Sequence, residues 1–334
     1  MRVTIKEIAN ALGVSPSTVS RALNNVPGVT EEVRNRVRRL AREMGYKPSA
    51  AARSLVTKRT GNIGLFIPRG LSFVMTNPFF AEVMEGIVGV LDGDGYNYVF
   101  CSSPRQYRKL FVTNMVDGMI LFALRLGDPY IDELESSDVP AVVVGSYIES
   151  LGIPAVRPDD SGGTFQAVSH LIRQGHTRIG LLNGPLSSYK SRGCLQGYRS
   201  AFLEHGIEED DSLLLCGEFV MDWGLEGARR LMGMKNPPTA VMCANDLIAQ
   251  GVYRYAFETG LRIPEDLSVV GFGDFPVASY MTPPLTTVHT PLREMGARAA
   301  SLLRALMQGE GAGTTNIVFP VRLVERQSTA AKHG

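Results

Sequence analysis

Long apolar runs are absent from this 334-residue chain. No stretch approaches the ~20 apolar residues that a helix needs to cross a bilayer, so we expect no transmembrane segment and no membrane partner. Residues 1–7, MRVTIKE, are polar and helix-forming, which is not the pattern of a secretory signal peptide. These two features favour a cytoplasmic protein.

Cysteine is scarce, and the motifs of common catalytic sites are missing. The four cysteines (Cys101, Cys194, Cys216 and Cys243) are scattered without metal-ligand spacing. We therefore expect free thiols and no metal site. The chain has no Walker A loop, no G-x-G-x-x-G that opens a helix after a strand, no G-x-S-x-G and no H-E-x-x-H. We expect neither an enzyme nor a bound cofactor.

Net charge is nearly absent too, at +1, but this value hides an asymmetry. Residues 1–59 carry 12 Lys and Arg against 4 Asp and Glu, a net charge of +8. The remaining residues carry 22 against 29, a net charge of −7. A basic head on an acidic body is typical of a protein that binds nucleic acid. A basic solvated surface would give the same count.

Two helix starts lie close together in the basic segment. Thr4 and Glu7 form a T-x-x-E capping box that opens a first helix, and Gly13 ends it. Ser15 is a good N-cap for a second helix, with Pro16 at its first position. Two short helices joined by a tight turn that contains glycine are typical of a helix-turn-helix.

The second helix has an apolar face and a small polar one. Val19 and Leu23 are four residues apart and share a side, which leaves Ser17 and Arg21 on the other. A short polar surface with one guanidinium suits the edges of bases in the major groove. An ordinary amphipathic surface helix has the same pattern, so the neighbouring segments decide between the two interpretations.

A third helix follows, with Thr30 as its cap and an apolar stripe formed by Val33, Val37, Leu40 and Met44. Gly45 is placed to end it. Several arginines of this helix are predicted to meet phosphates: Arg34, Arg38, Arg39 and Arg42.

The segment from Ile5 to Asn24, with the following Gly45-Tyr46-Lys47-Pro48, resembles the DNA-binding head of the LacI/GalR (lactose repressor) family. The resemblance implies that Pro16, Ser17 and Arg21 read an operator. It implies a helix-turn-helix domain over residues 1–46 that binds a palindromic double-stranded DNA operator as a homodimer. The predicted DNA-binding residues of this domain are Thr4, Ser15, Pro16, Ser17, Thr18, Ser20, Arg21 and Asn24.

Residues 47–60 match the hinge helix of the same family. Ser49 is a possible cap for one or two turns, which are marginal alone and are expected to fold only on binding. The resemblance places Ala52 and Leu55 at the DNA, with Leu55 as an apolar wedge in the minor groove. A plain linker between domains is the alternative.

From residue 61 onward, buried strands alternate with helices, which predicts parallel sheets. We expect an α/β core of two lobes like a periplasmic binding protein, so that the fold class is an all-α head plus this core. The core covers 61–334, with one lobe at about 61–157 and 289–318 and the other at about 158–288 and 319–334. Ligands of such sheets bind at the carboxyl ends of the strands, so the cleft between the lobes is the predicted site.

The resemblance implies a small-molecule effector in this cleft, a sugar or a sugar derivative. The charged clamps that the family commonly uses are missing, because Gly145, Cys194 and Gly273 stand at their positions. Lys190 raises the hypothesis of an anionic effector, although a surface lysine is the interpretation we favour. The predicted effector-binding residues are Phe79, Ser188, Lys190, Cys194, Trp223, Asn245 and Asp274.

Two further segments complete the expectations. Residues 69–76 form a loop longer than is typical of the family, and residues 327–334 form a short polar tail without heptads, which favours a dimer over a coiled-coil tetramer. The resulting hypothesis is a transcriptional repressor switched by an effector. The alternative is a free solute-binding protein of a sugar transporter.

Overall fold

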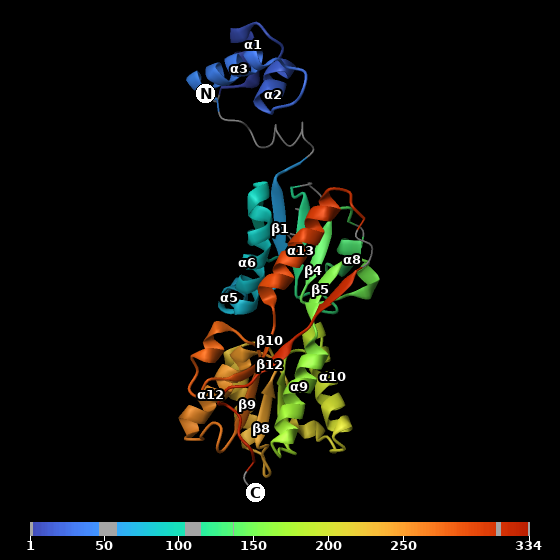
Figure 1. Cartoon of the computed structure of the whole chain (residues 1–334), viewed down its shortest axis with the longest axis vertical. Helices are drawn as coiled ribbons and strands as arrows, with labels where there is room; N and C mark the ends of the chain where they lie inside the picture. Colours follow the sequence, from blue (N-terminus) through green and yellow to red (C-terminus); the bar gives the residue numbers. More distant parts are fainter. Residues whose placement is uncertain (1–2, 47–58, 104–114, 136, 312–314, 333–334) are drawn as a thin grey trace. The chain divides into compact units, whose positions relative to one another are not determined.

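The computed structural model describes residues 3–46, 59–103, 115–135, 137–311 and 315–332. It divides into two compact units, Met1–Gly61 and Asn62–Gly334. The predicted all-α head and two-lobed α/β core are both present (Figure 1). Among the described helices, none combines the length and apolar character needed to span a bilayer.

Three helices build the first unit: α1 (Ile5–Leu12), α2 (Pro16–Leu23) and α3 (Glu31–Glu43). Their common core holds Ile8 and Ala9 of α1, Val19 and Ala22 of α2, and Val37 and Ala41 of α3.

The caps predicted for the head are confirmed. The capping box of Thr4 and Glu7 is complete, and Ser15 accepts a hydrogen bond from the backbone N–H of Thr18. Thr30 caps α3 in the same way, through the N–H of Val33. Gly13 ends α1 in the left-handed conformation (φ 66°), which glycine adopts without strain.

Arg34 corrects one prediction, because it is buried and does not face solvent phosphates. Its guanidinium donates to the carbonyl oxygens of Ala22, Val26 and Val29 and to Asn25 Oδ1. Its Nε lies 3.1 Å from a carboxylate oxygen of Glu31. Since it bonds the end of α2 and the following turn from its place on α3, Arg34 holds the head together.

The first lobe of the core is a six-stranded sheet in the order β11-β5-β4-β3-β1-β2, and all its pairings are parallel. Helices α5 (Leu71–Thr76), α6 (Pro78–Leu91), α8 (Ile131–Glu135) and α13 (Leu292–Met307) belong to this lobe. The strands are β1 (Asn62–Phe66), β2 (Asn97–Cys101), β3 (Gly118–Phe122), β4 (Ala141–Val144), β5 (Ala155–Pro158) and β11 (Asn316–Phe319).

The second lobe repeats this plan in the order β12-β10-β9-β8-β6-β7, with only the β12–β10 pair antiparallel. Helices α9 (Asp160–Arg173), α10 (Tyr189–Glu204), α11 (Met221–Met232) and α12 (Asp246–Thr259) flank the sheet. The strands are β6 (Ile179–Asn183), β7 (Leu214–Cys216), β8 (Ala240–Cys243), β9 (Ser268–Gly273), β10 (Thr286–His289) and β12 (Arg322–Val324).

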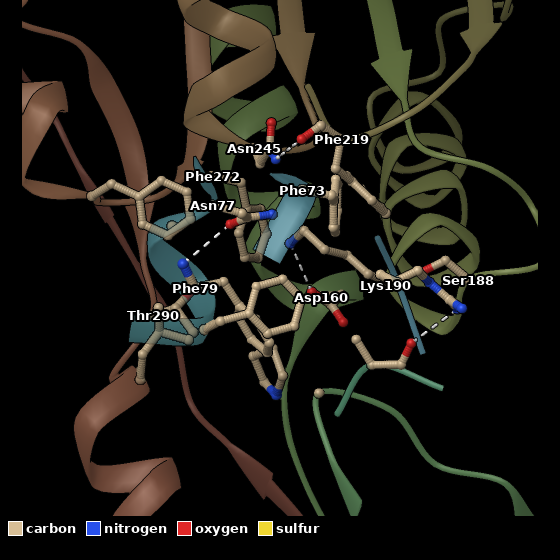
Figure 2. A pocket seen from close by; sticks show the side chains of 18 of the residues that line it. Phe73, Asn77, Phe79, Asp160, Ser188, Lys190, Phe219, Asn245, Phe272 and Thr290 are labelled. Carbon is tan, nitrogen blue, oxygen red and sulfur yellow. Dashed lines mark hydrogen bonds and ion pairs between the residues drawn. The ribbon is translucent and has the colours of Figure 1, made fainter. Parts of the chain in front are cut away.

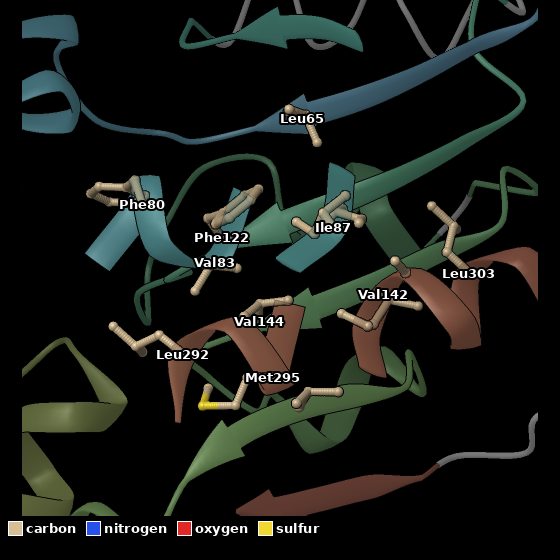
Figure 3. Packing of buried hydrophobic residues seen from close by; sticks show 14 of the residues in the cluster. Leu65, Phe80, Val83, Ile87, Phe122, Val142, Val144, Leu292, Met295 and Leu303 are labelled. Atoms are coloured by element: carbon tan, nitrogen blue, oxygen red, sulfur yellow. The ribbon is translucent and has the colours of Figure 1, made fainter. Parts of the chain in front are cut away.

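Both sheets are buried on their two faces, as expected of parallel strands. In β4, Val142 and Val144 point to the cluster under α6 and α13, whereas Val143 points to the cluster on the opposite face. Figure 3 shows Phe80, Val83 and Ile87 of α6 facing Phe122 and Val144 of the sheet. The two strongly apolar faces explain why the strands read as continuous hydrophobic runs in the sequence.

One expectation for the core is wrong. Residues 71–76 form the helix α5 and not a loop, and Val74 anchors this helix in the core. The described part of the C-terminal segment packs against the second lobe, because Ser328 is fully buried and its Oγ donates to the carbonyl of Val269. Further on, Ala330 accepts a hydrogen bond from His176 Nε2. The segment therefore packs across the amino ends of β9 and β10 in the second lobe.

We predict that Arg34→Ala destabilises the head by about 2 kcal/mol, because it leaves carbonyl groups without their charged donor. Hydrogen exchange of the α2 and α3 amides in the full chain should then accelerate by roughly 30-fold, since each 1.4 kcal/mol is tenfold. Arg39→Ala is the matched control, since Arg39 lies exposed on the same helix. Equal effects of the two substitutions would contradict the structural role of Arg34.

Candidate nucleic-acid interface and ligand cleft

The exposed face of α2 is the candidate nucleic-acid interface. Val19 and Ala22 are buried against the other two helices, so Pro16, Ser17 and Arg21 are left exposed. The backbone carbonyl of Arg21 accepts a hydrogen bond from Val26 N–H, but its side chain makes no hydrogen bond or ion pair with any other described residue, so the guanidinium is available to a ligand. Thr18 and Ser20 are half-buried beside this face.

Several predicted DNA-binding side chains are already used within the head. Ser15 Oγ lies 2.7 Å from Ser17 Oγ and 2.8 Å from Thr18 Oγ1, so these hydroxyls form one cluster at the start of α2. Asn24 donates to the carbonyl of Ser20 at the other end of the helix. At α1, the backbone N–H of Thr4 bonds the Glu7 carboxylate and lowers its pKa. Ala52 and Leu55 lie outside the described residues.

The candidate ligand site is a cavity between the two lobes of the core. Its walls come from the carboxyl ends of parallel strands in both sheets, as the sequence predicts for the cleft. The first lobe contributes Arg69 after β1, Ala123 and Arg125 after β3, Gly145 after β4 and Pro158 at the end of β5. The second lobe contributes Asp160 at the start of α9, Ser188 and Lys190 after β6, Phe219 after β7, Asn245 after β8, Gly273 and Phe275 at and after β9, and Thr290 after β10.

Four of the predicted effector-binding residues line this cavity: Phe79, Ser188, Lys190 and Asn245. Lys190 is not a surface lysine, because its Nζ lies 3.0 Å from Asp160 Oδ1 and 3.4 Å from the centroid of the Phe272 ring (Figure 2). Its charge is thus balanced inside the protein. Asn245 caps α12 through Ile248 N–H and donates to the carbonyl of Phe219, so most of its amide is engaged.

The other three predicted residues lie elsewhere. Cys194 is fully buried one helical turn beyond Lys190, where burial raises the pKa of its thiol to about 11. Trp223 donates its indole N–H to the carbonyl of Asn183 and packs against Gly217. Asp274 is bound by Arg326 at 2.6 Å and by His289 at 3.0 Å, so its carboxylate is directed away from the cavity.

The sequence prediction missed most of the cavity wall. Asp160 and Thr290 could have been predicted from the sequence, because each follows a strand and ligands bind at strand ends. Phe73 could not have been predicted, since it comes from helix α5, in a segment expected to be a loop.

A buried carboxylate fixes one edge of the cavity. Asp246 accepts hydrogen bonds from the backbone N–H of Phe275 (2.7 Å) and from the Thr287 hydroxyl (2.6 Å). Burial raises the pKa of Asp246 to about 6. The bond to Phe275 holds the segment after β9 so that the Phe275 side chain lines the cavity.

A latch crosses the cleft beside the cavity. Arg125 of the first lobe donates two hydrogen bonds to the carboxylate of Glu218 in the second, at 3.1 and 2.8 Å. The adjacent backbone N–H of Leu126 donates to the carbonyl of Ser187 at 2.9 Å. These contacts define a closed arrangement of the two lobes.

Family models match both units of the chain. The model described as bacterial regulatory proteins, lacI family, matches residues 4–49, and the periplasmic binding protein-like domain matches residues 168–329. The chain is 34% identical to the HTH-type transcriptional repressor CytR of Escherichia coli (strain K12), over 98% of this chain and 96% of that protein. It is also 34% identical to the HTH-type transcriptional regulator CelR of Thermobifida fusca, over 98% of each.

Solved structures agree with these matches. The transcriptional regulator CelR-cellobiose complex has a TM-score of 0.76 at 32% identity, covering 98% of this chain and all of that one. The lac repressor dimer bound to operator and the anti-inducer ONPF has a TM-score of 0.83 at 29% identity, covering 99% of this chain and all of that one.

We predict that Glu218→Ala weakens the latch and speeds hydrogen exchange at the Leu126 amide. A partly exposed ion pair contributes about 0.5–1 kcal/mol, which corresponds to roughly 2- to 5-fold in the exchange rate. Glu226→Ala is the control, because Glu226 pairs with Arg229 and Arg230 within α11. Exchanging the two charges, Arg125→Glu with Glu218→Arg, should restore part of the protection. No change at Leu126 in Glu218→Ala would rule out the latch.

Proposed function

Because the chain belongs to the LacI family of bacterial regulatory proteins, we propose that it is a transcriptional repressor whose operator affinity is set by a small molecule in the cleft between its lobes. The observation that carries this proposal is the cavity itself. Both lobes contribute its walls, so a bound molecule changes the free energy of lobe closure.

The head supplies the DNA contacts in this proposal. Arg21 enters the major groove, where a guanidinium makes two hydrogen bonds to the O6 and N7 of guanine. The exposed arginines of α3 meet phosphates and position the helix without reading sequence. Arg34 takes no part in this, because it is bonded within the head.

Residues 47–60 connect these events in the proposed mechanism. A hinge helix forms only when two copies of the chain lie on a palindromic operator, and Leu55 then enters the minor groove as a wedge. The effector shifts the population between a lobe arrangement that permits this pairing and one that does not. The protein acts as a homodimer, and it acts in the cytoplasm because its DNA target is there. We propose no enzymatic role.

We predict that Arg21→Ala lowers specific operator affinity by roughly 10- to 100-fold, since a bidentate contact to a base contributes about 1–3 kcal/mol. Non-specific binding should fall little, because it rests on the total charge of the head. Fluorescence anisotropy with a selected operator and with scrambled DNA measures both affinities. Arg39→Ala is the matched control and should weaken the two kinds of binding alike; the same pattern for Arg21 would contradict its assignment.

For the hinge, we predict that Leu55→Ala reduces specific binding and the bending of the operator while non-specific, salt-dependent binding persists. Gel mobility with circularly permuted operator fragments measures the bend. An unchanged bend angle would contradict the role of Leu55 as a wedge.

The switch itself is tested by a thermal-shift screen of small molecules, followed by operator binding with each compound that stabilises the core. A compound that binds the cleft should change operator affinity. If no cleft ligand does so, the switch fails as a proposal even though the head binds DNA. A solute-binding protein of a transporter is the alternative; it would bind its ligand without any operator, and the relatives over the full chain favour the regulator.

A further inference from the structure

Phenyl rings dominate the wall of the interlobe cavity. Six of the 14 phenylalanines of the chain line it, from both lobes: Phe73, Phe79, Phe80, Phe219, Phe272 and Phe275. Figure 2 shows Phe73, Phe79, Phe219 and Phe272 around the Lys190–Asp160 pair. Neighbouring rings meet edge to face, with 5.2 Å between the centroids of Phe79 and Phe80 and 5.9 Å between those of Phe73 and Phe80.

Two of these rings occupy space that a side chain at a neighbouring glycine position would need. A Cβ atom at Gly145 would come within 2.8 Å of the Phe79 ring, and one at Gly273 within 3.0 Å of the Phe275 ring. Both glycines also have positive φ, 78° and 128°. Each ring therefore packs directly on a glycine that has no side chain to displace it. At these two positions the cavity wall is aromatic, and a charged side chain would not fit.

The charged groups of the cavity are neutralised by the protein. Arg69 is held by both oxygens of Asp128 at 3.2 Å, and Arg125 is held by Glu218. Lys190 is held by Asp160 and by the face of Phe272. A ligand with hydroxyl groups on all sides would lose its hydration here and find few free partners in return.

Two side-chain hydroxyl groups add polar atoms to the cavity wall. The Thr290 hydroxyl is buried without a hydrogen-bond partner among the described residues, and Thr290 lines the cavity. The Ser188 side chain also lines it and makes no cap bond to α10. A buried hydroxyl without a hydrogen bond raises the free energy of the folded protein, so a polar atom of a ligand that bonds it would be stabilising.

We propose that the effector carries a planar aromatic ring, held between the phenyl rings of the two lobes, and a smaller polar part that bonds Thr290 and Ser188. The inference rests on the proposed function, because it names the chemical class of that same effector. Aromatic rings prefer offset-stacked or edge-to-face contacts, and the edge-to-face arrangement already present among Phe73, Phe79 and Phe80 extends naturally to one more ring. Such a ring would be buried by both lobes and would favour their closure.

The test compares ligands that differ only in the ring. Benzamide is paired with acetamide, and 2-phenylethanol with ethanol, in calorimetric titrations of the full chain; each ring-bearing member has one planar ring and one small polar group. We expect at least one ring-bearing member to bind, and to bind more than tenfold tighter than its ring-free partner. The inference is overturned if no ring-bearing member binds, or if the ring-free partner binds as tightly.

Substitutions then locate the ring. Phe79→Leu keeps an apolar side chain and should reduce the preference for the ring-bearing member at least 5-fold, whereas Phe79→Tyr should retain it. Phe257→Leu is the matched control, since Phe257 is 82% exposed near the end of α12 and does not line the cavity. Equal preference in Phe79→Leu and Phe257→Leu would overturn the placement of the ring.

Operator binding separates this inference from the proposed function. A ring-free sugar that binds the cleft and shifts operator affinity would retain the function and overturn the aromatic effector. A ring-bearing ligand that binds tightly but leaves operator affinity unchanged would support the ring and contradict the switch.

Discussion

The convergence of strand ends on one cleft is the constraint on which the core depends. The chain crosses between the lobes three times, after β5, after β10 and between β11 and β12. Both sheets therefore direct the carboxyl ends of their parallel strands toward the same cavity. Residues far apart in sequence, such as Arg69 and Thr290, line the same cavity as a result. A ligand that contacts both lobes is coupled to their closure by the topology itself.

Charged side chains have different roles in the head and in the core, and the net charge of a segment does not distinguish these roles. In the head, Arg34 is buried among carbonyl groups and stabilises the packing of α2 on α3, while Arg21 remains exposed. In the core, Arg125 joins the two lobes and Lys190 is neutralised by Asp160. The net charge of +8 over residues 1–59 thus correctly indicates nucleic acid but overstates how many of its arginines are free to contact phosphates.

Local chemistry was predictable from the sequence, and tertiary environment was not. Caps such as Thr4 with Glu7, or Ser15 with Pro16, involve residues within four positions, so the sequence determines them directly. The alternation of strands and helices can also be read along the sequence, and it predicted two parallel sheets with a cleft at the carboxyl ends of their strands. The family pattern, by contrast, placed Cys194 and Asp274 at the site, whereas one is buried behind Lys190 and the other is bound by Arg326. Pairs such as Gly145 with Phe79 are separated by 66 positions, and only the fold brings them together.

Two kinds of interaction stabilise the closed arrangement of the lobes. Hydrogen bonds that cross the cleft, from Arg125 to Glu218 and from Leu126 to Ser187, fix the closed geometry without a ligand. They are directional, but a partly exposed ion pair adds only modest stability. Burial of phenyl surface is not directional and grows with the area removed from water. In the proposed mechanism, a ligand that fills the space between the rings contributes most of the closing free energy, and the latch fixes the geometry of the closed lobes.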